Sequence, residues 1–249
     1  MEVHAHTHTP RKKWTHYFWE FLMLFLAVFC GFLAEYQLEH KIEKDRERQY
    51  VKALLSDLKS DTAQLRNLIN FRLEKMKTLD TIMYLLKTGA WKNNTALLYY
   101  HGFFAPFANK FLPNNGVLTQ LKNAGGLRLL RNSKVTDSLL YFDIQTQWVT
   151  DFENFERDRF IDPSPWEKVL DASVFESNLE YKYPREVFML NRISGNPPLL
   201  SEKKEDFDRF YNRVQLQKRL NAVVINRFFL LKIQTAKLMI LIKNEYNLK

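Results

Sequence analysis

The sequence contains little glycine and little proline, with 7 Gly and 8 Pro among 249 residues. Together they make up about half of the share that these two residue types usually have. Few glycines and prolines mean few tight turns and few positions that need a positive φ. This composition excludes a sandwich or barrel of many short strands, and it also excludes a low-complexity chain.

Cysteine is rarer still, because Cys30 is the only one and has no cysteine partner within the chain. The sequence also lacks the motifs of phosphate-binding loops, dinucleotide-binding turns, serine hydrolases, zinc proteases and dithiol redox sites. A catalytic nucleophile needs a base beside it, and the only histidines after Cys30 are His40 and His101. We therefore expect a protein that is not an enzyme and that holds no cofactor.

The acidic residues of the segment 151–159 are interleaved with Arg157 and Arg159, which is typical of a solvent-exposed helix face. A hydrolase that uses paired carboxylates is the alternative interpretation of this segment. The carboxylates concerned are Asp151, Glu153, Glu156 and Asp158.

One long apolar run, YFWEFLMLFLAVFCGFLA, occupies residues 17–34. In a helix its 18 residues span about 27 Å, close to the thickness of the hydrocarbon core of a bilayer. The sequence therefore predicts a short basic tail at 1–13, a transmembrane helix at 14–35 and a helical domain at 36–249. Basic and aromatic side chains at the entrance of the run are typical membrane anchors. These residues are Arg11, Lys12, Lys13, Trp14, Tyr17 and Trp19.

A buried core helix and a cleaved signal peptide are the alternatives for the apolar run. The run has no polar face, although a core helix of a globular protein usually presents one to solvent. It is longer than the apolar part of a usual signal peptide, and Phe32-Leu33-Ala34 has a phenylalanine where cleavage requires a small residue. These features favour an uncleaved signal anchor.

The basic residues Arg11 to Lys13 favour an N-terminus in the cytoplasm and a main domain in the periplasm. A simple count of Lys and Arg past the other end of the run points the opposite way. Those residues are Lys41, Lys44, Arg46, Arg48 and Lys52. We prefer the first orientation, in a bacterial inner membrane, because a signal anchor with a short basic tail normally inserts that way.

Apolar residues recur at steps of three and four over 36–88, a segment without Gly or Pro. Similar patterns predict helices at 134–161, after the N-cap Ser133, and at 202–247, after Ser201. No strand-like alternation with turn residues stands out. We therefore expect an all-α protein, in which one N-terminal transmembrane helix continues into an elongated antiparallel helical bundle.

The finer pattern adds detail to this bundle. The apolar stripe of the first long helix passes through Ile69, Leu73 and Met76. Short helices are expected at 117–123 and 166–175. The segment 181–200 contains three prolines and a glycine, and we expect a loop there.

Aromatic residues are dense between Trp91 and Phe111. Such a segment usually forms a small core at the tip of a helical hairpin. A ligand pocket at this tip is the alternative.

The formal net charge is +9, and the segment 209–249 carries nine basic residues against the single acidic residue Glu245. An antiparallel bundle returns the last helix toward the membrane, where Lys237, Lys243 and Lys249 would contact anionic headgroups. The alternative is a solvated face with cations at a helix C-terminus. We expect no nucleic-acid partner, because these charges are scattered around an apolar helix.

The N-terminal tail has histidines at alternate positions, His4, His6 and His8. Neutral imidazoles with this spacing can chelate nickel, copper or zinc. Tails of this kind also carry histidines without binding metal. We expect no metal site and retain these three residues as the candidates.

The segments 39–61 and 113–142 resemble a group of single-pass bacterial membrane proteins of a domain-of-unknown-function family. The matching residues of the second segment are Leu118, Leu121, Gly125, Gly126, Leu127, Leu130 and Asn132. The resemblance implies a single-pass membrane protein and no particular activity. We expect a scaffold or protein-interaction module in contact with the lipid bilayer, as a homo-oligomer or with another membrane protein. The alternative is a ligand-sensing module that acts through a membrane partner.

Overall fold

The computed structural model describes residues 13–123, 125–159, 164–182 and 187–248. The chain forms two compact units, Met1–Lys52 and Ala53–Lys249, which we call unit 1 and unit 2. Helix α1 (Trp14–Thr88) contributes to both units. The predicted transmembrane helix and the predicted first long helix are therefore parts of one element.

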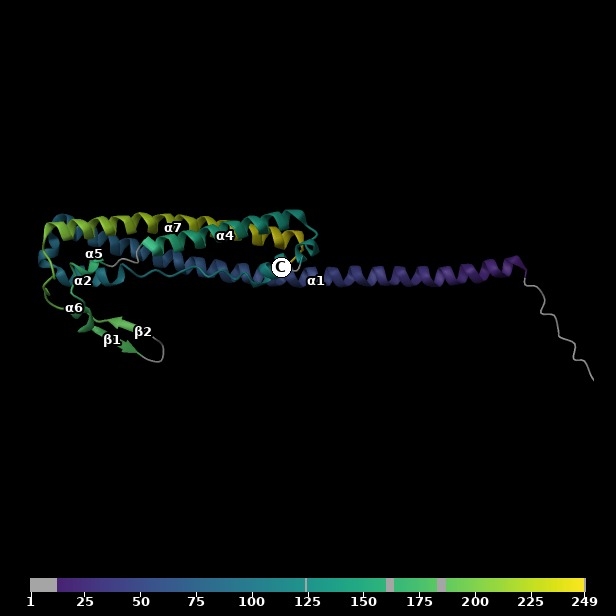
Figure 1. Cartoon of the computed structure of the whole chain (residues 1–249), viewed down its shortest axis with the longest axis horizontal. Helices are drawn as coiled ribbons and strands as arrows, with labels where there is room; N and C mark the ends of the chain where they lie inside the picture. Colours follow the sequence, from purple (N-terminus) through teal and green to yellow (C-terminus); the bar gives the residue numbers. More distant parts are fainter. Residues whose placement is uncertain (1–12, 124, 160–163, 183–186, 249) are drawn as a thin grey trace, which may run out of the picture. The chain divides into compact units, whose positions relative to one another are not determined.

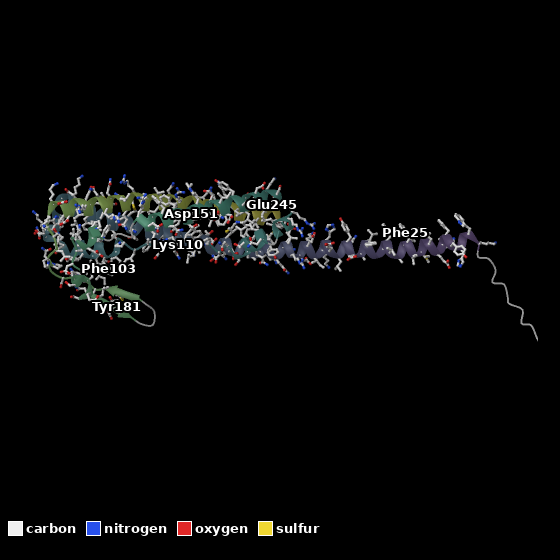
Figure 2. The ribbon with its side chains drawn as sticks, viewed as in Figure 1. Phe25, Phe103, Lys110, Asp151, Tyr181 and Glu245 are labelled. Carbon is white, nitrogen blue, oxygen red and sulfur yellow. The ribbon has the colours of Figure 1, made fainter. Side chains whose placement is uncertain are left out.

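The apolar run of α1 lies exposed in unit 1. Its most apolar window has a mean hydropathy of 2.0, and none of that window is buried. Among the described residues, α1 is the one helix that is long and apolar enough to cross a membrane. Figure 2 shows side chains on both sides of this run, with Phe25 labelled.

Unit 2 is built on three long helices, α4 (Ser133–Arg159), α7 (Lys204–Glu245) and the part of α1 that follows Lys52 (Figure 1). Thr62 of α1 contacts Met239 near the end of α7, and Asp80 contacts Lys218 near its beginning. Helix α7 is therefore antiparallel to α1. Helix α4 is also antiparallel to α7, because Asn132 donates to Glu245 over 2.6 Å. The all-α class predicted from the sequence is confirmed.

The core of unit 2 follows from residues at steps of three and four on each long helix. Such steps place side chains on one face, which the other two helices then cover. Buried core residues include Leu58, Leu65 and Leu79 of α1, Leu139, Phe142 and Val149 of α4, and Phe210, Val214, Phe228 and Leu231 of α7.

Short elements connect the long helices, and several of them gather at one end of unit 2 (Figure 1). Between α1 and α4 lie the short helices Ala90–Asn93, α2 (Thr95–Phe104), α3 (Gly116–Asn123) and Gly126–Leu129. Between α4 and α7 lie α5 (Ser164–Glu167), α6 (Ala172–Glu176), β1 (Leu179–Lys182) and β2 (Val187–Leu190).

The two strands correct the prediction of a loop over 181–200. They pair antiparallel, with Leu179 opposite Leu190 and Lys182 opposite Val187. Each strand has four residues. An alternation this short is too weak to recognise in a single sequence, because pairing with the partner strand decides the conformation.

The predicted N-cap of α4 is displaced by one residue. The backbone N–H of Val135 donates to the Asn132 side-chain oxygen over 3.2 Å, so Asn132 caps the helix and Ser133 is its first residue. Asparagine and serine are comparable N-caps, which is why the sequence did not separate them.

Candidate functional site

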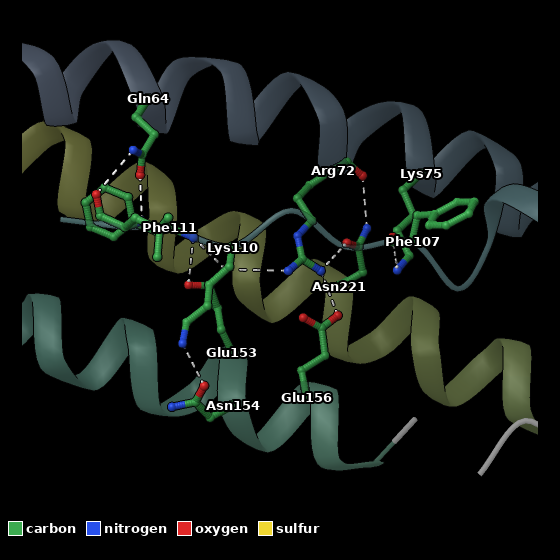
Figure 3. Close-up of polar contacts among 11 residues, drawn as sticks. Gln64, Arg72, Lys75, Phe107, Lys110, Phe111, Glu153, Asn154, Glu156 and Asn221 are labelled. Atoms are coloured by element: carbon green, nitrogen blue, oxygen red, sulfur yellow. Dashed lines mark hydrogen bonds and ion pairs between the residues drawn. The ribbon is translucent and has the colours of Figure 1, made fainter. Parts of the chain in front are cut away.

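A cluster of charged side chains lies buried between the three long helices (Figure 3). Arg72 of α1, which is 1% exposed, donates through Nη1 to Glu156 Oε1 of α4 over 2.7 Å and to Asn221 Oδ1 of α7 over 3.2 Å. Its Nη2 lies 3.7 Å from Glu153 Oε1. Asn221 Nδ2 donates in turn to the Arg72 carbonyl over 2.9 Å. These four residues, which we call the buried charge cluster, join α1, α4 and α7.

Burial shifts the pKa of two groups at this cluster. It raises the pKa of the Glu153 carboxyl to about 7, although the Arg72 guanidinium and the Phe111 N–H favour the ionised form. Burial also lowers the pKa of the Lys75 ammonium to about 8, and repulsion from Arg72 adds to this effect. Glu153 can therefore gain or lose a proton near neutral pH without leaving the protein interior.

Residues 105–115 connect α2 to α3 without regular secondary structure, and we call them the strap. Side chains from the three long helices pair with its backbone N–H and C=O groups. Such pairing is needed because an unpaired buried backbone group is costly. Gln217 donates to the Ala105 carbonyl (2.6 Å), Lys75 donates to the Phe107 carbonyl (2.9 Å), and the N–H groups of Phe111, Leu112 and Asn114 donate to Glu153 (3.2 Å), Gln64 (2.7 Å) and Asp61 (2.9 Å).

A cavity of about 250 Å³ opens between the strap and α4, beside the buried charge cluster. Lys110 lies at its edge, where Nζ donates to Asn154 Oδ1 over 2.9 Å. Cations outnumber carboxylates in the wall of this cavity. The cations are Arg72, Lys75, Lys110 and Arg157, and the carboxylates are Glu153 and Glu156.

The structure corrects the prediction that the acidic residues of α4 share a solvent-exposed face. Asp151 and Asp158 are exposed, but Glu153 and Glu156 are 5% and 3% exposed. Glu153 and Glu156 are three residues apart and therefore lie on one face of α4, which is the face that contacts Arg72.

Arg72 itself was missed because the predicted stripe of the first helix ran through Leu73. The structure leaves Leu73 41% exposed and buries Arg72. A signal was present in the spacing, since Leu65, Leu68, Arg72, Lys75 and Leu79 follow one another at steps of three and four. A charged residue at such a step indicates a buried ion pair, but its partners on α4 and α7 cannot be read from the spacing.

The structure describes only some of the predicted membrane-anchor residues. Lys13, Trp14, Tyr17 and Trp19 are exposed at the beginning of α1. Arg11 and Lys12 lie outside the described residues, as do His4, His6 and His8 of the candidate metal tail. The described residues contain no group of three or more His, Cys, Asp or Glu side chains that could hold a metal ion.

Lys237 and Lys243 are exposed on the last turns of α7, and Lys249 lies outside the described residues. Since Met239 contacts Thr62, the end of α7 lies at the same end of unit 2 as Ala53. The antiparallel return of the last helix is therefore confirmed within unit 2. Contact of these lysines with lipid headgroups stays a prediction.

The aromatic segment contributes to the core at one end of unit 2. The ring centroids of Trp91 and Phe207 are 4.6 Å apart, and Tyr99 and Trp91 are buried. The hydroxyl of Tyr99 donates to the Pro198 carbonyl over 2.7 Å. Phe111 is also buried, in the strap. The predicted small core is thus present, while ligand binding at this tip stays a prediction.

The chain matches no protein-family model, no curated protein and no solved structure. The resemblance of the segments 39–61 and 113–142 to single-pass bacterial proteins therefore stays a prediction.

Proposed function

We propose that this chain is a single-pass membrane protein whose unit 2 is a helical scaffold or protein-interaction module. The observation that carries the proposal is the apolar run of α1, of which no part is buried in the most apolar window. A helix that is apolar on all sides is stable only where lipid or protein covers it. The amphipathic rings of Trp14 and Tyr17 at its start favour lipid, because such rings prefer the headgroup level.

We place the protein in a bacterial inner membrane, with the N-terminus in the cytoplasm and unit 2 in the periplasm. Basic residues that include Lys13 precede the run and support this orientation. A reporter that works only after export, fused after Lys249, should be active, and a reporter that works only in the cytoplasm should be inactive. The reverse pair of results would overturn the orientation.

Membrane anchoring is tested by placing charge inside the apolar run. The double variant Leu24→Lys and Val28→Lys carries two cations near the middle of the run. Each lysine raises the free energy of membrane insertion by about 2.5–3.5 kcal/mol at the bilayer centre. We expect the variant protein to be released when membranes are washed at alkaline pH. The matched control, Leu38→Lys with Ile42→Lys, has the same spacing beyond the run and should stay. Equal retention of both variants would contradict anchoring by this run.

The interaction role is tested by cross-linking lysines of the wild-type chain in its own membranes. A scaffold predicts a discrete adduct of defined mass that contains this chain. If the chain stays in the membrane and only monomer is recovered, the interaction role is wrong.

A second candidate function is the sensing of a small anion, with the signal passed to a membrane partner. The cavity beside the buried charge cluster favours it, because four cations and two carboxylates line about 250 Å³. Inorganic phosphate should raise the unfolding temperature more than chloride does at equal ionic strength. This extra rise in unfolding temperature with phosphate should disappear in the Lys110→Met variant. It should persist in the Lys122→Met variant, since Lys122 does not line this cavity. Equal gains with both anions would exclude this function for phosphate.

A further inference from the structure

Two rows of large apolar side chains lie exposed on unit 2. The first row is on α4 and the second on α7, and both have steps of three, four or seven residues, which place side chains on one helix face. The opposite faces of both helices supply the buried core. The α4 row is Tyr141, Ile144, Trp148 and Phe155, and the α7 row is Val223, Leu230, Ile233 and Ile240.

The two rows adjoin along the contact between α4 and α7, which lie side by side in unit 2 (Figure 1). The guanidinium carbon of Arg227 lies 3.0 Å from the centroid of the Trp148 ring. Val223 and Leu230 are four residues before and three residues after Arg227, so they flank it on the same face of α7. Tyr141 lines a groove together with Leu241. The rows therefore meet around Arg227 in one apolar patch, where Trp148 lies beside Val223 and Leu230. Ile233 and Ile240 continue the α7 row farther around the helix.

The charges around this patch are separated by helix. Helix α4 has no Lys or Arg between Val135 and Glu156, and α7 has no Asp or Glu between Arg209 and Asn244. The exposed charges beside the rows are Asp137 and Asp151 on α4, and Arg219 and Lys237 on α7. Within the described part of the chain, Asp137, Asp151 and Lys237 form no ion pair.

We propose that a second copy of this chain covers the patch, with α4 of each copy packed against α7 of the other. The proposal rests on the proposed interaction role and names the partner. Two copies can meet through this patch about a two-fold axis that runs along the helices or across them. With an axis along the helices, the acidic α4 of each copy lies over the basic α7 of the other copy. With an axis across the helices, α4 lies over the other copy's α4 and α7 lies over the other copy's α7. The separation of charge selects the first arrangement, since like charges face each other in the second.

The register within one copy fixes which residues meet. Trp148 lies level with Arg227, and the helices are antiparallel, so Ile144 lies level with Leu230 and its neighbours. Asp137 and Lys237 line the same groove and are therefore also level. A two-fold axis parallel to the helices does not shift residues along the helix direction. Residues that lie level within one copy are therefore level with each other across the dimer. In the dimer, Ile144 then packs on the partner's Leu230, and Asp137 faces the partner's Lys237.

Cysteine cross-linking in membranes tests this arrangement. The full chain first receives Cys30→Ser, and two differently tagged versions then receive Ile144→Cys or Leu230→Cys. Both positions are exposed, so neither substitution removes core packing. A short bis-maleimide should join the 144 version to the 230 version when they are co-expressed. Each version expressed alone should give at most a small fraction of that dimer.

A charge swap provides the second measurement. Lys237→Glu should lower the yield of the mixed cross-link several-fold, and adding Asp137→Lys to both versions should restore it. Lys232→Glu is the matched control, because Lys232 is five residues from Lys237 and lies about 140° around the helix. It changes the charge by the same amount and should leave the yield unchanged.

The remaining outcomes separate this proposal from the interaction role. Dimers formed only within each version would overturn the α4–α7 arrangement. A cross-link only to a different protein would overturn the second copy as occupant and leave the interaction role standing. No cross-link from a membrane-bound chain would overturn the proposal, while a chain found outside the membrane would overturn the proposed function itself.

Discussion

Arg72 and Glu156 form an ion pair of 2.7 Å between α1 and α4, and their side chains are 1% and 4% exposed. A buried ion pair costs desolvation energy, so its presence does not by itself make the fold more stable. Removal of one partner is severe, because the other charge is then left without compensation in a region of low dielectric constant.

Replacing Arg72 with methionine should therefore destabilise unit 2 by about 3–5 kcal/mol, measured by urea unfolding of the full chain. Lys77→Met is the matched control on the same helix, since Lys77 pairs with Glu74 at the surface and should contribute less than about 1 kcal/mol. A combined variant that also carries Glu153→Gln and Glu156→Gln should recover part of the loss. Equal stability of the Arg72→Met and Lys77→Met proteins would show that the cluster has no role in stability.

The contribution of Glu153 to the stability of unit 2 should fall as pH rises from about 4.5 to 7. The pKa of Glu153 is about 7 in the folded chain and near 4.5 when unfolded, so the folded chain binds more protons in this window. The full shift corresponds to about 3 kcal/mol. Glu153→Gln should flatten this decline, as measured by urea unfolding at several pH values, and an unchanged slope in the variant would contradict the shifted pKa.

Lys75 should act in the opposite direction at higher pH. Its pKa is about 8 in the folded chain and 10.5 in the unfolded chain, so the unfolded chain binds more protons between these values. The contribution of Lys75 to stability should therefore rise from pH 8 to 10.5, and Lys75→Met should remove that rise. A parallel pH profile for the variant would be inconsistent with a buried ammonium group.

Gly102 marks a close approach between α2 and the segment after α5. The Trp166 indole N–H donates to the Gly102 carbonyl over 3.2 Å, and an added Cβ would overlap the Leu170 side chain. Gly102→Ala should lower the free energy of unfolding by about 1–3 kcal/mol through overpacking. Gly116→Ala, at the first residue of α3, meets no atom within 4 Å and should be nearly neutral. Similar losses in both variants would argue against overpacking.

Asp61 holds the end of the strap by accepting from the backbone N–H and the side-chain amide of Asn114, over 2.9 and 2.7 Å. Asp61→Ala should speed hydrogen exchange at the Asn114 amide, because that N–H loses its acceptor. Ser60→Ala removes only the exposed contact to the Asn114 side chain and should leave that exchange rate unchanged. Equal rates in the two variants would show that Asp61 does not hold the strap.

The long helices could be predicted from the sequence because their apolar periodicity is a local property. The order of α1, α4 and α7 follows from the same local signals. The predicted start of α7 follows Ser201, whereas the helix begins at Lys204, and the helix predicted at 166–175 is instead the two short helices α5 and α6. The polar contacts could not be predicted, since Arg72, Glu156 and Asn221 are brought together by packing of helices far apart in sequence. The strap has no periodicity at all, because its backbone partners are side chains of other elements.

The second unpredicted feature is the exposed apolar face of α7. Its sequence is apolar on several sides, and only burial in the structure separates Phe228, which is in the core, from Leu230, which is at the surface. The exposed side of α7, which includes Leu230, is the side that the proposed second copy covers.

The location of the apolar run can be measured directly with the native Cys30. Cys30 lies inside the run, four residues before its end at Ala34, and is exposed in the chain itself, so insertion into lipid would shield it. In membranes opened on both sides, a charged maleimide should leave Cys30 unlabelled until detergent is added. A Cys30→Ser protein with Glu39→Cys, beyond the run, should be labelled without detergent. Labelling of Cys30 in membranes as fast as in detergent would contradict membrane anchoring by the apolar run.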